Sequence, residues 1–249
     1  APTAGQLVRP GDKLVYRITV ANGGGTAGNT ARTETVPAGT SYSGTAEGWS
    51  CTGSSCTQTV NAAANASPSV NFTVTVNTPG TVSAINNSVT SSTGTCTNCT
   101  VSTTAAQADM SSTTTSTATT VNVPVTVSST CTNNGPQAAT NATCAVSVSG
   151  YPGAATTCTP VSPVVSLTAA TTPVGTNQMV CTTTFTPTTA GSVTVTTTAG
   201  SDLHDPTPGN NVTTGAVTVN TVASLVTGKA LATINGTAPT AGQLVHPGL

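Results

Sequence analysis

The sequence predicts an all-β chain built from antiparallel β-sandwiches. Thr and Val, which favour strands, are abundant in a chain of 249 residues whose charged residues make up only 4%. Apolar and polar residues alternate over short runs, so each predicted strand has one buried face. Turn-forming dipeptides separate these runs. Many short strands of this kind are typical of sandwiches.

The alternation places strands at residues 13–20, 70–76, 121–127, 144–148 and 193–195. Pro124 cannot donate a ladder hydrogen bond, so its part of the strand is expected at a sheet edge. The turn signals between the runs are Asn22-Gly23, Pro37-Ala38-Gly39, Pro79-Gly80, Asn134-Gly135-Pro136 and Pro206-Thr207-Pro208-Gly209.

A long repeat is visible at the two ends of the sequence. Residues 1–11 read APTAGQLVRPG and residues 238–248 read APTAGQLVHPG, so only Arg9 and His246 differ. The second copy starts 237 positions after the first (238 − 1 = 237). We interpret the chain as one period of a longer tandem-repeat protein, followed by a short overlap.

A shorter repeat lies inside this period. Asn22-Gly23 precedes Asn29 by the same distance as Asn134-Gly135 precedes Asn141. The chain therefore divides into units of roughly 110–120 residues, the size of an Ig-like sandwich. We predict unit one at 1–108, unit two at 109–221, and the first strand and loop of the next copy of unit one at 222–249.

The first strand of unit one is missing from its expected place. Unit two has a strand candidate at 110–119, opened by the sequence QADM, but only a loop precedes Lys13 in unit one. A similar stretch opens with VASL at 222–225, and its strand is expected around residues 223–234. We expect this run to complete the next unit head to tail, because the edge would otherwise be exposed. Whether it pairs within one chain or between chains stays open. The residues that we expect to form this inter-unit strand are Ala223, Leu225, Leu231 and Ile234.

The eight cysteines favour a disulfide framework and an oxidising, extracellular location at the cell surface. Eight cysteines allow 105 pairings, so the spacing only suggests a connectivity. A redox or zinc role for Cys96 and Cys99 lacks nearby histidines and a βαβ context. The suggested pairs are Cys51–Cys56, Cys96–Cys99, Cys131–Cys144 and Cys158–Cys181.

One turn is a candidate calcium site, because Asp202, Asp205, Asn210 and Asn211 offer hard oxygen ligands. The favoured alternative is a turn built from Asx and Pro residues, with no cofactor. The histidines are His204, in this turn, and His246, which an arginine replaces in the other copy. No residues suit a hydrolytic triad, so we expect no enzymatic activity.

Charge and hydropathy exclude two classes of partner. Lys and Arg total 5, too few for nucleic-acid binding, and no apolar run has the roughly 18–20 residues of a spanning helix. Trp49 next to Cys51 is more typical of sandwich core packing than of a sugar-binding platform.

Several motifs together resemble one family. The run PGD at 10–12, the strand YRITV at 16–20, Pro37-Ala38-Gly39, the sequence GWSC at 48–51 and DPTPGNN at 205–211 resemble the prokaryotic "domain of unknown function eleven" repeats. Gly24-Gly25 departs from the usual Gly-Pro, and the Cys96–Cys99 turn is also atypical. The resemblance implies Ig-like sandwiches in long bacterial surface proteins, with no catalytic residues.

These observations predict a structural repeat segment of an extracellular bacterial fibre, filament or stalk, whose partners are copies of itself. Near-zero charge, a formal net −1, removes long-range repulsion between packed copies. The alternative is an adhesin array that binds a host or surface glycan. That function would require several exposed, clustered aromatic side chains.

Overall fold

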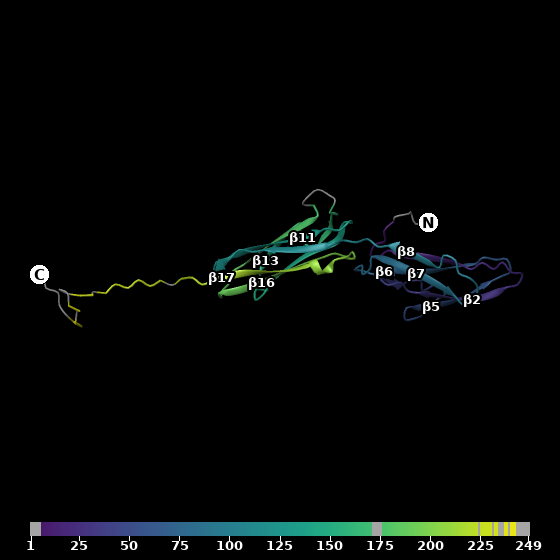
Figure 1. The fold of residues 1–249 in the computed structure, drawn as a ribbon, viewed down its shortest axis with the longest axis horizontal. Helices are drawn as coiled ribbons and strands as arrows, with labels where there is room; N and C mark the ends of the chain where they lie inside the picture. The colour runs from purple at the N-terminus through teal and green to yellow at the C-terminus, as the bar shows by residue number, and fades with distance from the viewer. Residues whose placement is uncertain are drawn as a thin grey trace.

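The computed structural model describes residues 6–170, 176–223, 225–230, 232–233, 237–238 and 240–242. Its strands form two sandwiches that lie end to end, and the chain continues beyond the second sandwich as an extended tail (Figure 1). Apart from the short 3-10 turn η1 (Pro208–Asn210), the described elements are strands. The predicted fold class, tandem antiparallel sandwiches with disulfides, is confirmed.

Unit one consists of a three-stranded sheet, in the order β1-β6-β3, and a five-stranded sheet, in the order β4-β5-β2-β7-β8. Its pairings between named strands are antiparallel. The strands are β1 (Lys13–Thr19), β2 (Gly28–Thr35), β3 (Thr40–Tyr42), β4 (Ser50–Thr52), β5 (Ser55–Ala62), β6 (Ser69–Val76), β7 (Ala84–Ser91) and β8 (Thr100–Thr104).

Unit two has a four-stranded sheet, β13-β15-β11-β9, and a five-stranded sheet, β10-β17-β16-β12-β14. The short β10 pairs with β17 in parallel, and the other pairings are antiparallel. The strands are β9 (Met110–Thr115), β10 (Thr119–Thr120), β11 (Val125–Asn133), β12 (Ala139–Val148), β13 (Ala155–Thr159), β14 (Val164–Leu167), β15 (Gln178–Phe185), β16 (Gly191–Gly200) and β17 (Val212–Asn220).

The strand expected at 121–127 begins four residues late. Asn122 has φ 62, a left-handed conformation that ends any strand, and its amide bonds to the carbonyl of Pro187 instead of extending the ladder. β11 therefore starts at Val125, beyond Pro124. Gly11, with φ 88, makes the corresponding turn before β1.

The residue of unit two that is structurally equivalent to Asn22 lies one position before Asn134, the residue that the Asn-Gly match in the sequence gives. Asn22 and Asn133 each accept a hydrogen bond from the amide two residues later, at 3.0 Å, and donate through Nδ2 to loop carbonyls. Asn134 has no such role. Asn22 therefore corresponds to Asn133, because the side-chain bonding pattern, not the Asn-Gly dipeptide, defines the turn.

Small apolar residues fill both cores, with the aromatic rings at their centres. In unit one, Trp49 packs edge-on against Phe72, with ring centroids 5.2 Å apart, and its Nε1 donates to the carbonyl of Asn71 at 2.6 Å. In unit two, Tyr151 packs on Phe185 at 5.0 Å, beside a cluster of valines. Trp49 is thus a core residue, as its place beside Cys51 suggests.

The structure contains the four disulfides suggested by the spacing. Cys51–Cys56 and Cys158–Cys181 each join directly opposite residues of paired strands, with Cα atoms 4.0 Å apart. Cys131–Cys144 links β11 to β12 and so ties the two sheets of unit two together. Cys96–Cys99 closes the turn before β8. Disulfides of this kind indicate an oxidising compartment.

Candidate functional site

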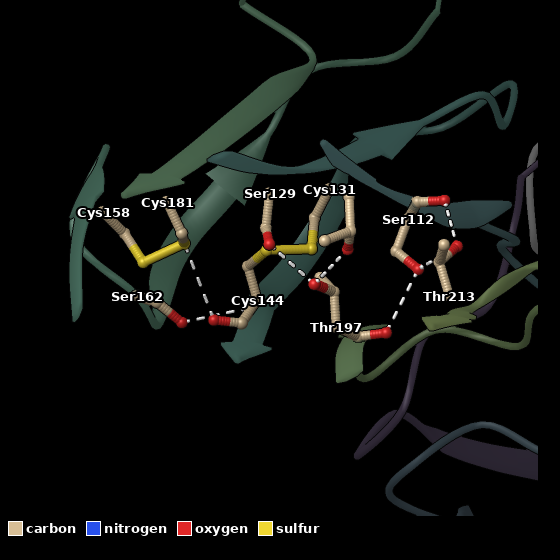
Figure 2. The surroundings of a disulfide bond; sticks show 10 residues. Ser112, Ser129, Cys131, Cys144, Cys158, Ser162, Cys181, Thr197 and Thr213 are labelled. Atoms are coloured by element: carbon tan, nitrogen blue, oxygen red, sulfur yellow. Dashed lines mark hydrogen bonds between the residues drawn. A yellow bond between two sulfur atoms is a disulfide. The ribbon is translucent and has the colours of Figure 1, made fainter. Parts of the chain in front are cut away.

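The first strand of unit two, β9, closes one side of its sandwich. β11 is paired with β15 on one edge and with β9 on the other. β9 also reaches the opposite sheet through hydroxyl groups (Figure 2). Ser112 Oγ donates to the carbonyl of Thr197 at 3.2 Å, and Thr114 Oγ1 lies 2.6 Å from Thr197 Oγ1. The strand thus hydrogen-bonds with both sheets.

Thr197 is fully buried, and its hydroxyl also donates to Ser129 Oγ at 2.7 Å. Thr197→Val is expected to cost about 1–3 kcal/mol, because it leaves buried hydroxyls without a partner. Chemical denaturation of the full chain measures the loss. Thr198→Val, on the exposed face of the same strand, is the control. Equal losses in the two variants would refute the structural role of this hydroxyl cluster.

Among the residues that the structure describes, unit one has no strand in the place of β9. Its β1 corresponds to β11, because both lead into the matched Asn22 and Asn133 turns. Within the described residues, β1 pairs with β6 on one edge only, and its other edge carries no strand. The counterpart of β10 is present as a single parallel bridge between Val8 and Ala105.

An open groove of about 1100 Å³ runs along this free edge. Its walls come from β1, β2, β7, β8 and the turn at residues 93–99. The effect of the gap is clear at Val101, which is 47% exposed, whereas its counterpart Val217 in unit two is fully buried. The side of the sandwich that β9 covers in unit two is therefore open in unit one.

The floor of the groove holds buried polar groups with unused bonding capacity. Glu34 is fully buried and accepts a hydrogen bond from Asn87 Nδ2 at 2.8 Å through one carboxylate oxygen only. Its other oxygen, Arg32 Nε and the Tyr16 hydroxyl have no partner. Buried polar groups are nearly always paired in a complete fold. Tyr16, Arg32 and Glu34 all line the groove, so these unpaired groups lie beside its open side.

Burial also changes the acidity of the groove. It raises the pKa of Glu34 from its usual 4.5 to about 7, although the bond from Asn87 opposes the shift. The pKa of Tyr16 rises to about 12, through burial and through the negative charge of Glu34. Both groups are thus held toward their neutral forms.

The predicted inter-unit strand lies in the tail. Residues 222, 223 and 225–230 are exposed and belong to no strand, and Leu225 and Val226 are each 91% exposed. Leu231 and Ile234 lie outside the described residues. The tail runs away from the second sandwich at the end opposite to unit one (Figure 1). Apolar side chains in such an exposed segment suggest a partner.

The candidate calcium turn makes structural bonds at the junction of the units. Asp205 accepts from the amides of Met110 and Thr207, at 2.9 and 2.8 Å. Asn210 Nδ2 donates to Asp109 Oδ1 at 3.0 Å. Asn141 donates to Asp202, and Asn211 belongs to the turn that follows η1. In the described part of the chain, no three His, Cys, Asp or Glu residues form a metal-binding group.

Of the two histidines, the structure describes His204. His204 acts through its backbone, whose carbonyl accepts from the amide of Ala108 at 3.0 Å, and His246 lies outside the described residues. The aromatic rings pack into the cores, where they are buried or half-buried. They are Tyr16, Tyr42, Trp49, Phe72, Tyr151 and Phe185.

The geometry defines two Ig-like sandwiches, each with two internal disulfides, and in the part of the chain that the structure describes the first sandwich has one strand fewer at the edge of β1. No family model and no curated protein matches the chain. Several solved structures are similar. A CARDB domain from Pyrococcus furiosus is 18% identical, over 45% of this chain and 94% of that chain, with a TM-score of 0.33. A putative membrane-anchored protein from Corynebacterium diphtheriae is 14% identical, over 90% and 53%, with a TM-score of 0.27.

A third structure, titled BspA_C_WT, is 12% identical and covers 86% of this chain and 95% of that chain, with a TM-score of 0.35. Among the residues that the structure describes, no helix is long and apolar enough to cross a bilayer.

Proposed function

We propose that this chain is a non-catalytic, structural repeat segment of an extracellular bacterial filament or stalk. Each tail inserts as a strand into the groove of unit one in the next copy, and the copies join head to tail. The occupant of the groove is therefore the tail of a second copy of the same unit pair. This role agrees with the repeats that the sequence resembles.

The observation that carries the proposal is the match between a missing strand and an unpaired one. The free edge of β1 presents backbone donors and acceptors that a strand would satisfy, as strand addition does in other proteins. The exposed tail supplies apolar side chains, among them Leu225 and Val226. Residues 238–248 repeat the segment that leads into β1, so the tail stands directly before a second copy of the motif that opens unit one.

The fibre role also accounts for the surface. The chain has 5 basic and 6 acidic residues, so packed copies repel one another little and bind with little dependence on salt. The aromatic rings that an adhesin would use for a glycan are instead in the cores. A fibre therefore explains more of the chain than a glycan-binding array does.

Truncation after Thr221 tests the proposal. The full chain is expected to form head-to-tail oligomers whose length grows with concentration, whereas the truncated chain stays monomeric. Because the truncated chain keeps its groove, adding it to the full chain is expected to shorten the oligomers by capping one end. Sedimentation velocity and electron microscopy measure both effects.

A full-length variant with residues 222–237 in scrambled order is the control for chain length and composition. Fluorescence of Trp49 confirms that unit one stays folded in each variant, because the chain has a single Trp. A truncated chain that assembles as well as the full chain would contradict the proposal. So would a full chain that remains monomeric up to its solubility limit.

A further inference from the structure

The last strands of the two units, β8 and β17, end with the same backbone hydrogen bond. This bond shows which residues are equivalent where the chain leaves each unit. The amide of Val8 donates to the carbonyl of Thr104 at 3.0 Å, and the amide of Val121 donates to the carbonyl of Asn220 at 3.0 Å. Thr104 and Asn220 are thus equivalent last residues of β8 and β17. Two residues further on, Ala106 corresponds to Val222.

The inward-facing side chains of β9 lie at fixed distances along the chain from the end of β8. Met110, Ser112 and Thr114 face the interior, with Met110 fully buried and Ser112 only 6% exposed. Met110, Ser112 and Thr114 lie four, six and eight residues after Ala106. The residues at the same distances after Val222 are Val226, Gly228 and Ala230. Resting on the proposed function, we infer that the tail enters the groove of the next copy in this register, with Ala230 in the place of Thr114.

The polarity of the tail supports this choice of face. The inward set continues to Ala232, so Val226, Gly228, Ala230 and Ala232 form one small, apolar face. In sequence the other face carries Leu225, Thr227, Lys229 and Leu231, and Lys229 is its charged residue. In this register the ammonium group of Lys229 stays in water, which avoids the cost of burying an unpaired charge.

The sizes of the side chains in the two units agree with this register. Gly215 lies under Thr114, and a Cβ added to Gly215 would stand 3.0 Å from the Thr114 methyl group. Gly215 lies five residues before Asn220, and Cys99 lies five residues before the equivalent Thr104, so Cys99 corresponds to Gly215. Cys99 lines the groove and is tied to Cys96. In unit two, the larger Thr114 on β9 lies over Gly215, which has no side chain. In the inferred register of unit one, the smaller Ala230 on the tail lies over the larger Cys99.

The inferred register differs by one residue from the match read from sequence. Aligning QADM with VASL equates Met110 with Leu225, whereas the structural exits equate Met110 with Val226. A shift by one residue turns every side chain to the opposite face. Ala223 and Leu225 then face outward, although both belong to the inserted strand.

Cysteine cross-linking tests the register. In unit two, Thr114 lies opposite Ser129, whose counterpart on β1 is Ile18. Directly opposite residues lie within disulfide reach, as Cys158 and Cys181 show with Cα atoms 4.0 Å apart. Full chains carrying Ile18→Cys are mixed with full chains carrying Ala230→Cys, Lys229→Cys or Leu225→Cys and then oxidised. Mass spectrometry identifies the linked peptides.

The pair 18–230 is expected to dominate, with 18–229 reaching at most about a tenth of its yield, because residue 229 faces outward. Dominant linkage of 18 to residue 229 or 225, in oligomers that still form, would overturn the register and leave the proposed function intact. Loss of assembly between unmodified chains would overturn the proposed function itself. Ile18→Cys alone, with no partner cysteine, shows whether the native disulfides have been disturbed.

Discussion

A chain carrying Ala230→Asp is expected to lose head-to-tail assembly, whereas one carrying Lys229→Asp is expected to keep it. In the inferred register, residue 230 lies over Cys99 inside the groove and residue 229 faces water. A carboxylate buried without a cation costs several kcal/mol. Since about 1.4 kcal/mol corresponds to a factor of ten, the association constant is expected to fall by at least ~100-fold.

Lys229→Asp is the control for overall charge, because it changes the net charge by −2, whereas Ala230→Asp changes it by −1. If overall charge governed association, the Lys229 variant would assemble less well. Sedimentation velocity over a concentration series gives the association constants, and the Trp49 signal reports on folding of unit one. Equal assembly by both variants would mean that the tail does not enter the groove with this face inward.

The sequence predicts most of the fold because the signals are local. Alternating Val and Thr define strands, Asn and Gly define turns, and short cysteine spacings in neighbouring strands suggest the disulfides. The sequence also predicts that unit one lacks its first strand, since no alternating run precedes Lys13. These features depend on residues close to one another in the chain.

The remaining features depend on contacts between distant segments. Glu34 and Arg32 alternate with polar residues and read as an ordinary exposed face, so the buried charge at the groove floor is not visible in sequence. The register of the tail requires equivalence of β8 and β17, which only their bridges to Val8 and Val121 reveal. The start of β11 depends on the backbone of Asn122, which periodicity does not encode.

Unit one is expected to lose stability as the pH rises, in contrast to proteins whose carboxylates are paired with cations. Burial raises the pKa of Glu34 from 4.5 to about 7, so the folded state binds a proton that the unfolded state releases between these values. The stability contribution is complete below about pH 4.5, falls as the pH rises, and levels off above about pH 7. At about 1.4 kcal/mol per pKa unit, the total loss is up to about 3 kcal/mol.

Glu34→Gln is expected to remove this slope, because the amide keeps an acceptor for Asn87 and carries no charge. The unfolding free energy is measured by urea denaturation near pH 4, 6 and 8, with fluorescence of Trp49 as the signal specific to unit one. Tyr16, held neutral by its raised pKa, and Arg32 line the same groove as Glu34. If stability instead rises over this range, Arg32 compensates the charge of Glu34 in solution, and the floor of the groove is a closed ion pair before any strand enters.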